Sequence, residues 1–219
     1  MSCDVMPMHF GSGGIIERGS CGDFGTPKND NCQSSGVMHS NPFSVVNGVY
    51  IELDVEPNTG LILPFNRRWQ NYFFKIAKVI ASQSKDPNTQ VGAVCVDPQS
   101  KRILNTGYNG FPSGVDESSK RWERPAKYDR VVHAEANCVA AAARFGVRLA
   151  DTAIFITHPP CTDCTKLLIS AGIRYIYYLE LADDSDSGAW KEKLQIAESM
   201  CVEAHVARIA VNPKFINLE

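Results

Sequence analysis

One histidine of metal-binding type stands far in sequence from a pair of cysteines, and a shared metal ion would require the fold to bring them together. His133 precedes Glu135 by two positions, and Cys161 and Cys164 follow later in a Pro-Cys-x-x-Cys segment. One imidazole nitrogen and two thiolates fill three positions of a tetrahedral zinc site and leave the fourth open, as in catalytic zinc sites. The segment around His133 must therefore fold beside the two cysteines.

Both groups of predicted ligands lie where helices are expected to begin. Residues 133–145 are rich in alanine and end at Gly146, a suitable C-cap, which predicts one helix. Residues 161–171 follow a Pro-Pro pair, which predicts a second helix. Because Cys161 and Cys164 are three residues apart, their thiols share one face of its first turn. The helix dipole favours the thiolate there.

Glu135 gives this predicted site a chemistry. A carboxylate two residues after the histidine can lie beside the zinc ion without binding it, and it can carry protons between zinc-activated water and a substrate. The order H-x-E…P-C-x-x-C is typical of zinc-dependent nucleobase deaminases. A Cys-x-x-Cys pair alone also occurs in structural zinc sites and redox pairs. The added His133 and Glu135 favour a catalytic site, with Glu135 as the catalytic residue.

The remaining periodicity predicts a sheet covered by helices on both faces. The strands on either side of the cysteine helix should be parallel, because a helix connects them. The additional elements expected, in chain order, are a helix over about 66–82, strands at 91–97, 102–108, 153–157 and 175–179, a helix over about 188–200 and a strand at 202–206.

Four further segments match, in order, the motifs of one known family. They are Asp86–Ala93, Gly107–Pro112, Lys127–Tyr128 and Ile169–Ile173. With the metal motif among them, the region from about residue 65 to 179 resembles the deoxycytidylate (dCMP) deaminases of the zinc-dependent cytidine deaminase superfamily. The resemblance covers about half of the chain and implies a cytidine deaminase-like α/β fold, in three α/β/α layers with a central mixed five-stranded sheet.

The same resemblance implies hydrolysis of dCMP to dUMP and ammonia, which feeds thymidylate synthesis. It also implies that Asn109 binds the sugar hydroxyl and that the backbone N–H of Ala134 meets the pyrimidine carbonyl. His158, just before the cysteine helix, is expected to stack on the base or approach the phosphate. Asn-Gly is a turn dipeptide in its own right, so Asn109 also has a purely structural alternative.

Members of this family are commonly homohexamers activated by dCTP and inhibited by dTTP, so the resemblance implies an allosteric homo-oligomer. A net charge of −2 and a pI near 6.2 argue against nucleic acid as a partner. Residues 117–130 hold five basic side chains among three acidic ones. Lys120, Arg121, Arg124 or Lys127 could bind one small phosphate, and a solvated loop of mixed charge is the alternative.

Composition sets the expected compartment and domain organisation. The chain has no apolar run of membrane-spanning length and no secretory signal pattern, so we expect neither a membrane span nor secretion. Eight cysteines, at least two of them needed as thiolates, fit the reducing cytoplasm. We expect a deaminase domain over residues 61–219.

Residues 1–60 are expected to form an irregular, partly disordered extension, because they are dense in Gly, Ser, Asn and Pro. A strand is expected at 45–53. The extension carries five residues that could hold a second zinc ion, although no pair has the usual ligand spacing. They are Cys3, His9, Cys21, Cys32 and His39.

Two alternatives to a dCMP deaminase remain open at this point. One is a deaminase of another cytosine nucleotide, such as dCTP or a 5-modified dCMP, of a nucleoside, or of a base in nucleic acid. The other is a non-catalytic, zinc-stabilised nucleotide-sensing module. Glu135 argues against the second alternative, because a structural zinc site has no use for a proton carrier.

Overall fold

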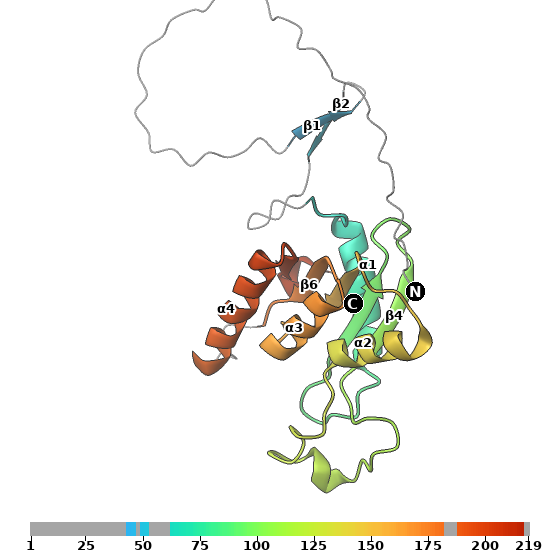
Figure 1. Ribbon diagram of the computed structural model, residues 1–219, viewed down its shortest axis with the longest axis vertical. Helices are drawn as coiled ribbons and strands as arrows, with labels where there is room; N and C mark the ends of the chain where they lie inside the picture. Colours follow the sequence, from blue (N-terminus) through green and yellow to red (C-terminus); the bar gives the residue numbers. More distant parts are fainter. Residues whose placement is uncertain (1–42, 47–48, 53–61, 182–187, 217–219) are drawn as a thin grey trace, which may run out of the picture. The chain divides into compact units, whose positions relative to one another are not determined.

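The computed structural model describes residues 43–46, 49–52, 62–181 and 188–216. Five strands form one mixed sheet in the order β4-β3-β5-β6-β7 (Figure 1). β3 is antiparallel to β4 and β5, whereas β5, β6 and β7 run parallel. The strands are β3 Gly92–Val96, β4 Ile103–Tyr108, β5 Ala153–Ile156, β6 Tyr175–Leu179 and β7 Ala207–Val211.

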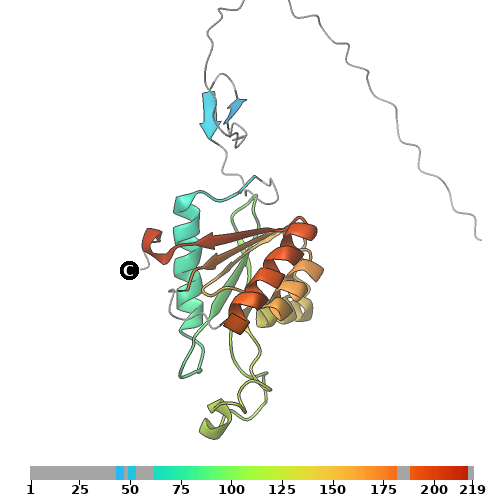
Figure 2. The same ribbon diagram turned by 90° about the vertical axis from the view of Figure 1, so that its left-hand side faces the viewer.

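Helices cover both faces of this sheet. Figure 2 shows α1 on one side and α2, α3 and α4 on the other. The helices are α1 Arg67–Ala81, α2 Ala134–Phe145, α3 Thr162–Ser170 and α4 Gly188–Glu203. A short 3₁₀ helix, Ser119–Trp122, lies between β4 and α2, and another, Pro213–Phe215, follows β7. The predicted three-layer α/β/α fold with a central mixed five-stranded sheet is confirmed.

The two hydrophobic cores follow from the alternation of side chains along the strands. On β5, Ile154 and Ile156 belong to the core beneath α2 and α3, whereas Phe155 belongs to the core beneath α1. Phe155 stacks on Tyr177, with 4.6 Å between the ring centroids. It also packs against Phe74 of α1. The three elements that carry these residues, β5, β6 and α1, are thereby held in one rigid scaffold.

Two strand glycines allow helices to approach the sheet closely. A Cβ atom at Gly107 of β4 would lie 2.3 Å from the Ala134 carbonyl oxygen and 2.6 Å from the Cys138 amide nitrogen. A Cβ atom at Gly92 of β3 would lie 2.0 Å from the Ala77 carbonyl oxygen of α1. Because any larger residue at position 107 would displace the first turns of α2, Gly107 sets the height of that helix above the sheet.

One predicted strand was placed wrongly. The alternating run at 202–206 suggested the last strand, but α4 continues to Glu203, and the strand is Ala207–Val211. His205 turns the chain with a positive φ of 53°. Cys201 is fully buried on the last part of α4, so packing extends the helix. The parallel pairing of Tyr175 with Ala207 then sets where the strand begins.

The strand predicted at 45–53 is instead a pair of short antiparallel strands. These are β1 Phe43–Val46 and β2 Val49–Glu52, in which Val46 pairs with Val49. The two residues between the strands in sequence are Asn-Gly, a dipeptide that favours tight hairpins. The five possible ligands of a second zinc ion lie outside the described residues, and the domain boundary at residue 60 stays a prediction. Within the described ranges, no helix combines the length and apolar character that a membrane span requires.

Candidate metal and active site

The three predicted metal ligands meet at the starts of two neighbouring helices. His133 is the N-cap residue of α2, Cys161 is the N-cap residue of α3, and Cys164 lies in the first turn of α3. Their potential ligand atoms all lie within 4.8 Å of one another. His133 Nδ1 is 3.6 Å from Cys161 Sγ and 3.4 Å from Cys164 Sγ. Within the described residues, no other group of three such side chains converges in this way.

The electrostatics of this cluster suit a soft cation. A hydrogen bond from the Cys164 thiol lowers the pKa of Cys161 to about 4, so Cys161 is the thiolate of the pair. Cys164 retains its proton because of that hydrogen bond and its burial, which raise its pKa. The hydrogen bond with Cys161 raises the pKa of His133. One imidazole and two thiols that converge beside a cleft are a donor set that zinc prefers, so the residues fit a zinc ion.

Glu135 lies beside the predicted metal ligands but does not belong to their group. Its side chain is buried in the first turn of α2, at 4 % exposure. Burial raises the pKa of Glu135 to about 7, because the charged carboxylate loses hydration there. A carboxyl group with a pKa near neutrality can both accept and release a proton at physiological pH, as a proton carrier requires.

A cleft of about 700 Å³ opens over this cluster. Six of the seven predicted site residues line it, namely His133, Ala134, Glu135, Asn109, His158 and Cys161. Cys164 does not line the cleft and is buried at 4 % exposure. The structure therefore brings together residues that span positions 109 to 164, and these come from α2, α3 and the connections that precede these helices.

The side-chain amide of Asn109 is held in one orientation. Its Oδ1 accepts a hydrogen bond of 2.7 Å from the Val91 backbone N–H. Its Nδ2 donates to the Thr89 carbonyl oxygen at 2.8 Å and to Asp86 Oδ2 at 3.3 Å. Because an amide has two N–H donors, both are occupied, and only a second lone pair on Oδ1 remains. Asn109 thus supports the loop structure and can offer a ligand an acceptor but no donor.

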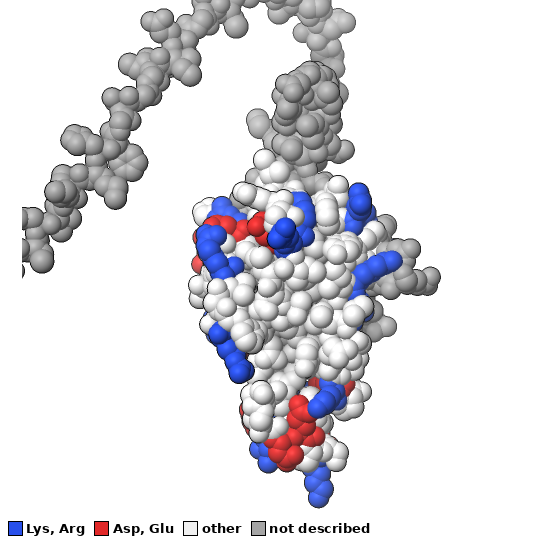
Figure 3. All heavy atoms as spheres, turned by 90° about the vertical axis from the view of Figure 1, so that its right-hand side faces the viewer, with Lys and Arg blue, Asp and Glu red and all other residues white. Residues whose placement is uncertain are grey.

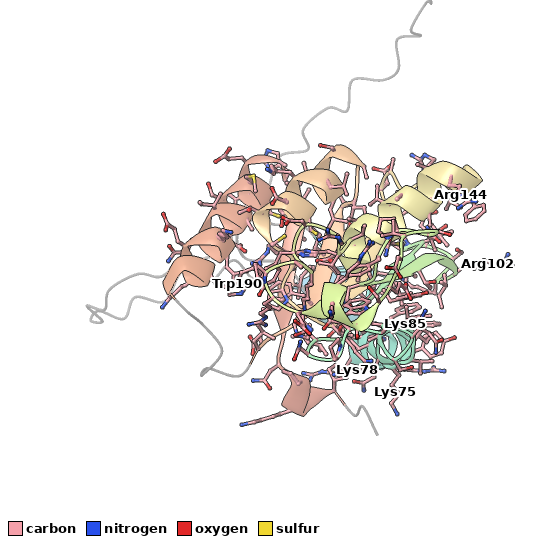
Figure 4. All side chains as sticks on the ribbon, turned by 90° about the horizontal axis from the view of Figure 1, so that it is seen from below. Lys75, Lys78, Lys85, Arg102, Arg144 and Trp190 are labelled. Atoms are coloured by element: carbon pink, nitrogen blue, oxygen red, sulfur yellow. The ribbon has the colours of Figure 1, made fainter. Side chains whose placement is uncertain are left out.

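Two buried polar atoms at the cleft have no hydrogen-bond partner within the described structure. They are Nδ1 of His158 and Nε1 of Trp190, both from residues that line the cleft. Burial and the nearby Lys78 charge lower the pKa of His158, so this imidazole is neutral at physiological pH. Figure 4 shows Trp190 on the side of α4 that faces the rest of the domain. Unpartnered buried polar atoms are costly, which suggests that a ligand or water meets them.

The predicted phosphate-binding cations divide into two groups. Arg124 and Lys127 line the cleft, whereas Lys120 and Arg121 are not among its lining residues. Lys127 is engaged elsewhere, because its Nζ lies 2.6 Å from Asp86 Oδ2 and the side chain is buried. Of the four candidates, Arg124 therefore remains as a cation that faces the cleft without an ion pair in the described structure.

Sequence reasoning missed the contribution of α4. Trp190 and Lys193 line the cleft from this helix, yet they lie in no recognisable motif. The available signal was their spacing of three residues, which places an aromatic group and a cation on one face of the predicted helix. That pattern is common on surface helices and does not by itself indicate a ligand.

The chain is similar in sequence to known deaminases. The family model described as "Cytidine and deoxycytidylate deaminase zinc-binding region" matches residues 67–180. A protein of Aliivibrio fischeri named "Uncharacterized deaminase in luxG 3'region" is 40% identical over 139 residues, which are 64% of this chain and 90% of that protein. The deoxycytidylate deaminase of Homo sapiens is 37% identical over 125 residues, which are 54% of this chain and 68% of that protein.

Solved structures with the same fold include a dCMP deaminase from the cyanophage S-TIM5, determined in complex with dCMP and dUMP. It aligns with a TM-score of 0.52 and 26% sequence identity, over 67% of this chain and 99% of the phage chain. The apo form of that phage enzyme aligns with a TM-score of 0.53 at 24% identity.

Proposed function

This chain belongs to the cytidine and deoxycytidylate deaminase zinc-binding family, and on that premise we propose that it hydrolyses dCMP to dUMP and ammonia with the help of zinc. The observation that carries the proposal is the convergence of His133, Cys161 and Cys164 next to a cleft that the buried Glu135 lines. The relatives named as deoxycytidylate deaminases support the choice of substrate.

The proposed reaction divides between the metal and the chain. His133, Cys161 and Cys164 would hold the zinc ion, which when bound supplies Lewis-acid activation of a water molecule. Glu135 takes a proton from the attacking water and delivers it to the ring nitrogen N3 as oxygen adds to C4. It then transfers the second proton to the departing amino group, so the C4–N bond breaks and ammonia leaves. The raised pKa of Glu135, about 7, supports this two-way role.

The base and the sugar would be recognised by two amide groups. Ala134 is the first residue of α2, where backbone N–H groups have no partner within the helix. Its N–H is thus suited to donate to the pyrimidine carbonyl. The remaining lone pair of Asn109 Oδ1 is suited to accept from a sugar hydroxyl. This donor and acceptor pattern supports a nucleotide that carries both a base carbonyl and a free hydroxyl.

A phosphate on the substrate would meet positive charge at the rim of the cleft. Arg124 and Lys193 supply two cations there, and the indole N–H of Trp190 supplies an unused donor. Figure 4 shows Lys85, Arg102 and Arg144 on the other side of the domain from Trp190. The small number of cations at the cleft favours one nucleotide over a polynucleotide, which would need a longer basic track. His158 remains proposed as a base or phosphate contact.

An ultraviolet assay of the zinc-loaded protein on four compounds tests the proposal. We expect selective turnover of dCMP over dCTP, deoxycytidine and a cytosine-containing oligonucleotide. Preference for another of the four would contradict the assigned substrate while keeping the deaminase chemistry. Zinc binding without turnover of any cytosine compound would contradict enzymatic function and favour a nucleotide-sensing module.

We extend the proposal to a homo-oligomer, a hexamer by family resemblance, that dCTP activates and dTTP inhibits. Figure 3 shows a face with few charged groups at its centre and both basic and acidic groups at its margins. Exposed apolar side chains on α1, β4 and α2, namely Tyr72, Val79, Ile103 and Phe145, support self-association. Light scattering with and without each nucleotide, alongside the assay, tests this extension. A monomer that neither nucleotide affects would contradict it.

The proposal places the enzyme in the cytoplasm. The three proposed ligands include two thiols, and these must stay reduced to bind zinc. The described part of the chain offers no membrane span. Recovery of activity from the soluble fraction of cells, and its absence from the membrane fraction, is the expected result.

A further inference from the structure

We propose that Asp86 and Lys127 form a positioning pair, which orients the Asn109 amide and thereby makes the site select nucleotides with a free sugar hydroxyl. This inference rests on the proposed function of the same cleft. Neither residue needs to touch the reacting atoms. Their role would be to determine which polar atom of Asn109 faces the substrate.

The carboxylate of Asp86 receives four hydrogen bonds. Oδ1 accepts from the backbone N–H groups of Asn88 at 2.9 Å and Thr89 at 3.2 Å. Oδ2 accepts from Lys127 Nζ at 2.6 Å and from Asn109 Nδ2 at 3.3 Å. Only an ionised carboxylate, which carries no proton of its own, can accept at both oxygens in this way.

The ionised state of Asp86 is stabilised by these same partners. Burial alone raises the pKa of Asp86, but the hydrogen bonds from Lys127, Asn88 and Thr89 outweigh burial and bring the pKa below its usual value. The side chains of Asp86 and Lys127 are 1 % and 6 % exposed. A buried charge is tolerated when it is paired and hydrogen-bonded, so each residue depends on the other.

This arrangement determines the direction of the Asn109 amide. Asp86 Oδ2 and the Thr89 carbonyl are both acceptors, so they require the NH₂ group of Asn109 on their side. The Val91 N–H is a donor and requires the amide oxygen on the other side. An amide turned by 180° would set donors against donors and acceptors against acceptors. Both N–H donors of Asn109 are therefore occupied, and its amide oxygen is the side-chain atom with a lone pair left to meet a ligand.

Lys127 also joins two walls of the cleft. It belongs to the connection between β4 and α2, which extends away from the sheet in Figure 1, whereas Asp86 belongs to the connection between α1 and β3. The backbone N–H of Val131 donates to the Lys127 carbonyl oxygen at 2.9 Å. Arg124, Tyr128 and Val131, on the same connection as Lys127, line the cleft. The ion pair thus holds the segment that carries Arg124 against the α1–β3 connection, to which the Asn109 amide also hydrogen-bonds.

A purely structural ion pair is the alternative, and it makes a different prediction. Loss of such a pair would weaken folding and lower activity toward every substrate to a similar extent. Loss of a positioning pair would change the preference between two substrates that differ only in the hydroxyl that Asn109 accepts. The ratio of two specificity constants separates these explanations, because a general loss of folded enzyme cancels from it.

The test compares dCMP with 2′,3′-dideoxycytidine monophosphate, which lacks the 3′-hydroxyl, on the full-length zinc-loaded protein. We expect the wild type to prefer dCMP by about tenfold or more in kcat/KM, since one hydrogen bond is lost without the hydroxyl. Asp86→Asn offers one oxygen to four donors, so it should release Asn109 and reduce that preference to about threefold or less. An unchanged preference in this variant would overturn the inference.

Two further variants distinguish a loss of the positioning role from misfolding. Asp86→Glu keeps the charge but moves the carboxylate by one methylene, so it should retain more stability and still lose the preference. Asp151→Asn removes an exposed ion pair with Arg148 and should leave the preference unchanged. Circular dichroism melting of each variant reports folding separately. Unaltered preference in Asp86→Glu, with Asp86→Asn unfolded, would also overturn the inference.

A binding measurement separates this inference from the proposed activity. Calorimetry of dUMP and 2′,3′-dideoxyuridine monophosphate with the zinc-loaded protein should show the same preference for the hydroxyl without any turnover. Selective binding by a wild type that turns over no cytosine nucleotide would contradict the proposed function and leave the positioning pair supported. Equal or absent binding of both nucleotides by the wild type would overturn the positioning pair.

Discussion

The metal end and the substrate end of the cleft are built in different ways. At the metal end, His133, Cys161 and Cys164 lie at the starts of two helices that pack on one rigid sheet. At the substrate end, Asn109 and Arg124 lie in the connections between elements, where the Asp86–Lys127 pair holds them. Under the proposed function, the chemistry would thus depend on secondary structure and its packing, whereas substrate selection would depend on a polar network between loops.

This difference predicts that changes at the metal end abolish the reaction and that changes at the substrate end alter its selectivity. Mutations in each region can be compared for their effect on zinc content, on turnover and on the ratio between substrates. Four predictions follow from this division, and the expected effects decrease from the first to the last.

The largest effect is expected from Cys161→Ala. Loss of one thiolate leaves two ligands, so zinc binding should fall sharply, and turnover should disappear with it. The melting temperature should also fall, because metal binding energy contributes to the stability of the folded state. Elemental analysis and thermal melting measure both quantities. Cys138→Ala, at a buried cysteine of α2 outside the ligand group, is the matched control and should retain zinc.

Glu135→Gln should separate catalysis from metal binding. The amide has the shape of the carboxylate but cannot carry a proton, so kcat should fall by about 10²–10⁴-fold. Zinc content should stay at the wild-type level because Glu135 is not a member of the ligand group. Steady-state kinetics together with elemental analysis provide the measurement. A variant with near-normal kcat would show that another group carries the proton.

At the substrate end, Lys193→Gln should change selectivity without removing the reaction. Loss of one cation at the rim should lower kcat/KM for dCMP by about tenfold, since charge-assisted hydrogen bonds to phosphate are among the stronger ones. The value for deoxycytidine, which has no phosphate, should hardly change. Lys191→Gln is the control on the same helix, because Lys191 does not line the cleft. Equal losses for both substrates would remove Lys193 from the phosphate site.

The smallest effect is expected on the pH dependence of the free energy of unfolding. The folded pKa of Asp86 lies below its usual value, so its contribution to stability is present above the pKa of the unfolded chain. That contribution is lost as the pH falls through the folded pKa. Asp86→Asn should therefore show a weaker loss of unfolding free energy on acidification from pH 6 to pH 3 than the wild type, in urea titrations. Parallel curves would contradict the ionised buried pair.

The comparison of the two ends also explains which sequence predictions were accurate. Both ligand-bearing helices were predicted within one residue at each end, because their caps and Gly or Pro signals are local. The last strand was predicted five residues too early. Residues 202–206 and 207–211 both have a strand-like pattern, and only the pairing with β6 determines that the second run is the strand. Lys127 was predicted as a phosphate ligand candidate, yet its partner Asp86 lies 41 residues away in sequence.

The sequence by itself determined the layered fold, the proposed metal donor set and the proposed proton carrier, since these depend on residue type, short spacing and periodicity. Tertiary structure alone decided which polar atom of the Asn109 side chain is left for a ligand, and which cation pairs with a buried carboxylate. It also decided that Trp190 and Lys193 line the cleft. Local signals arise from neighbours within about one helical turn. Hydrogen-bond direction and charge pairing arise between segments that meet only after the chain has folded.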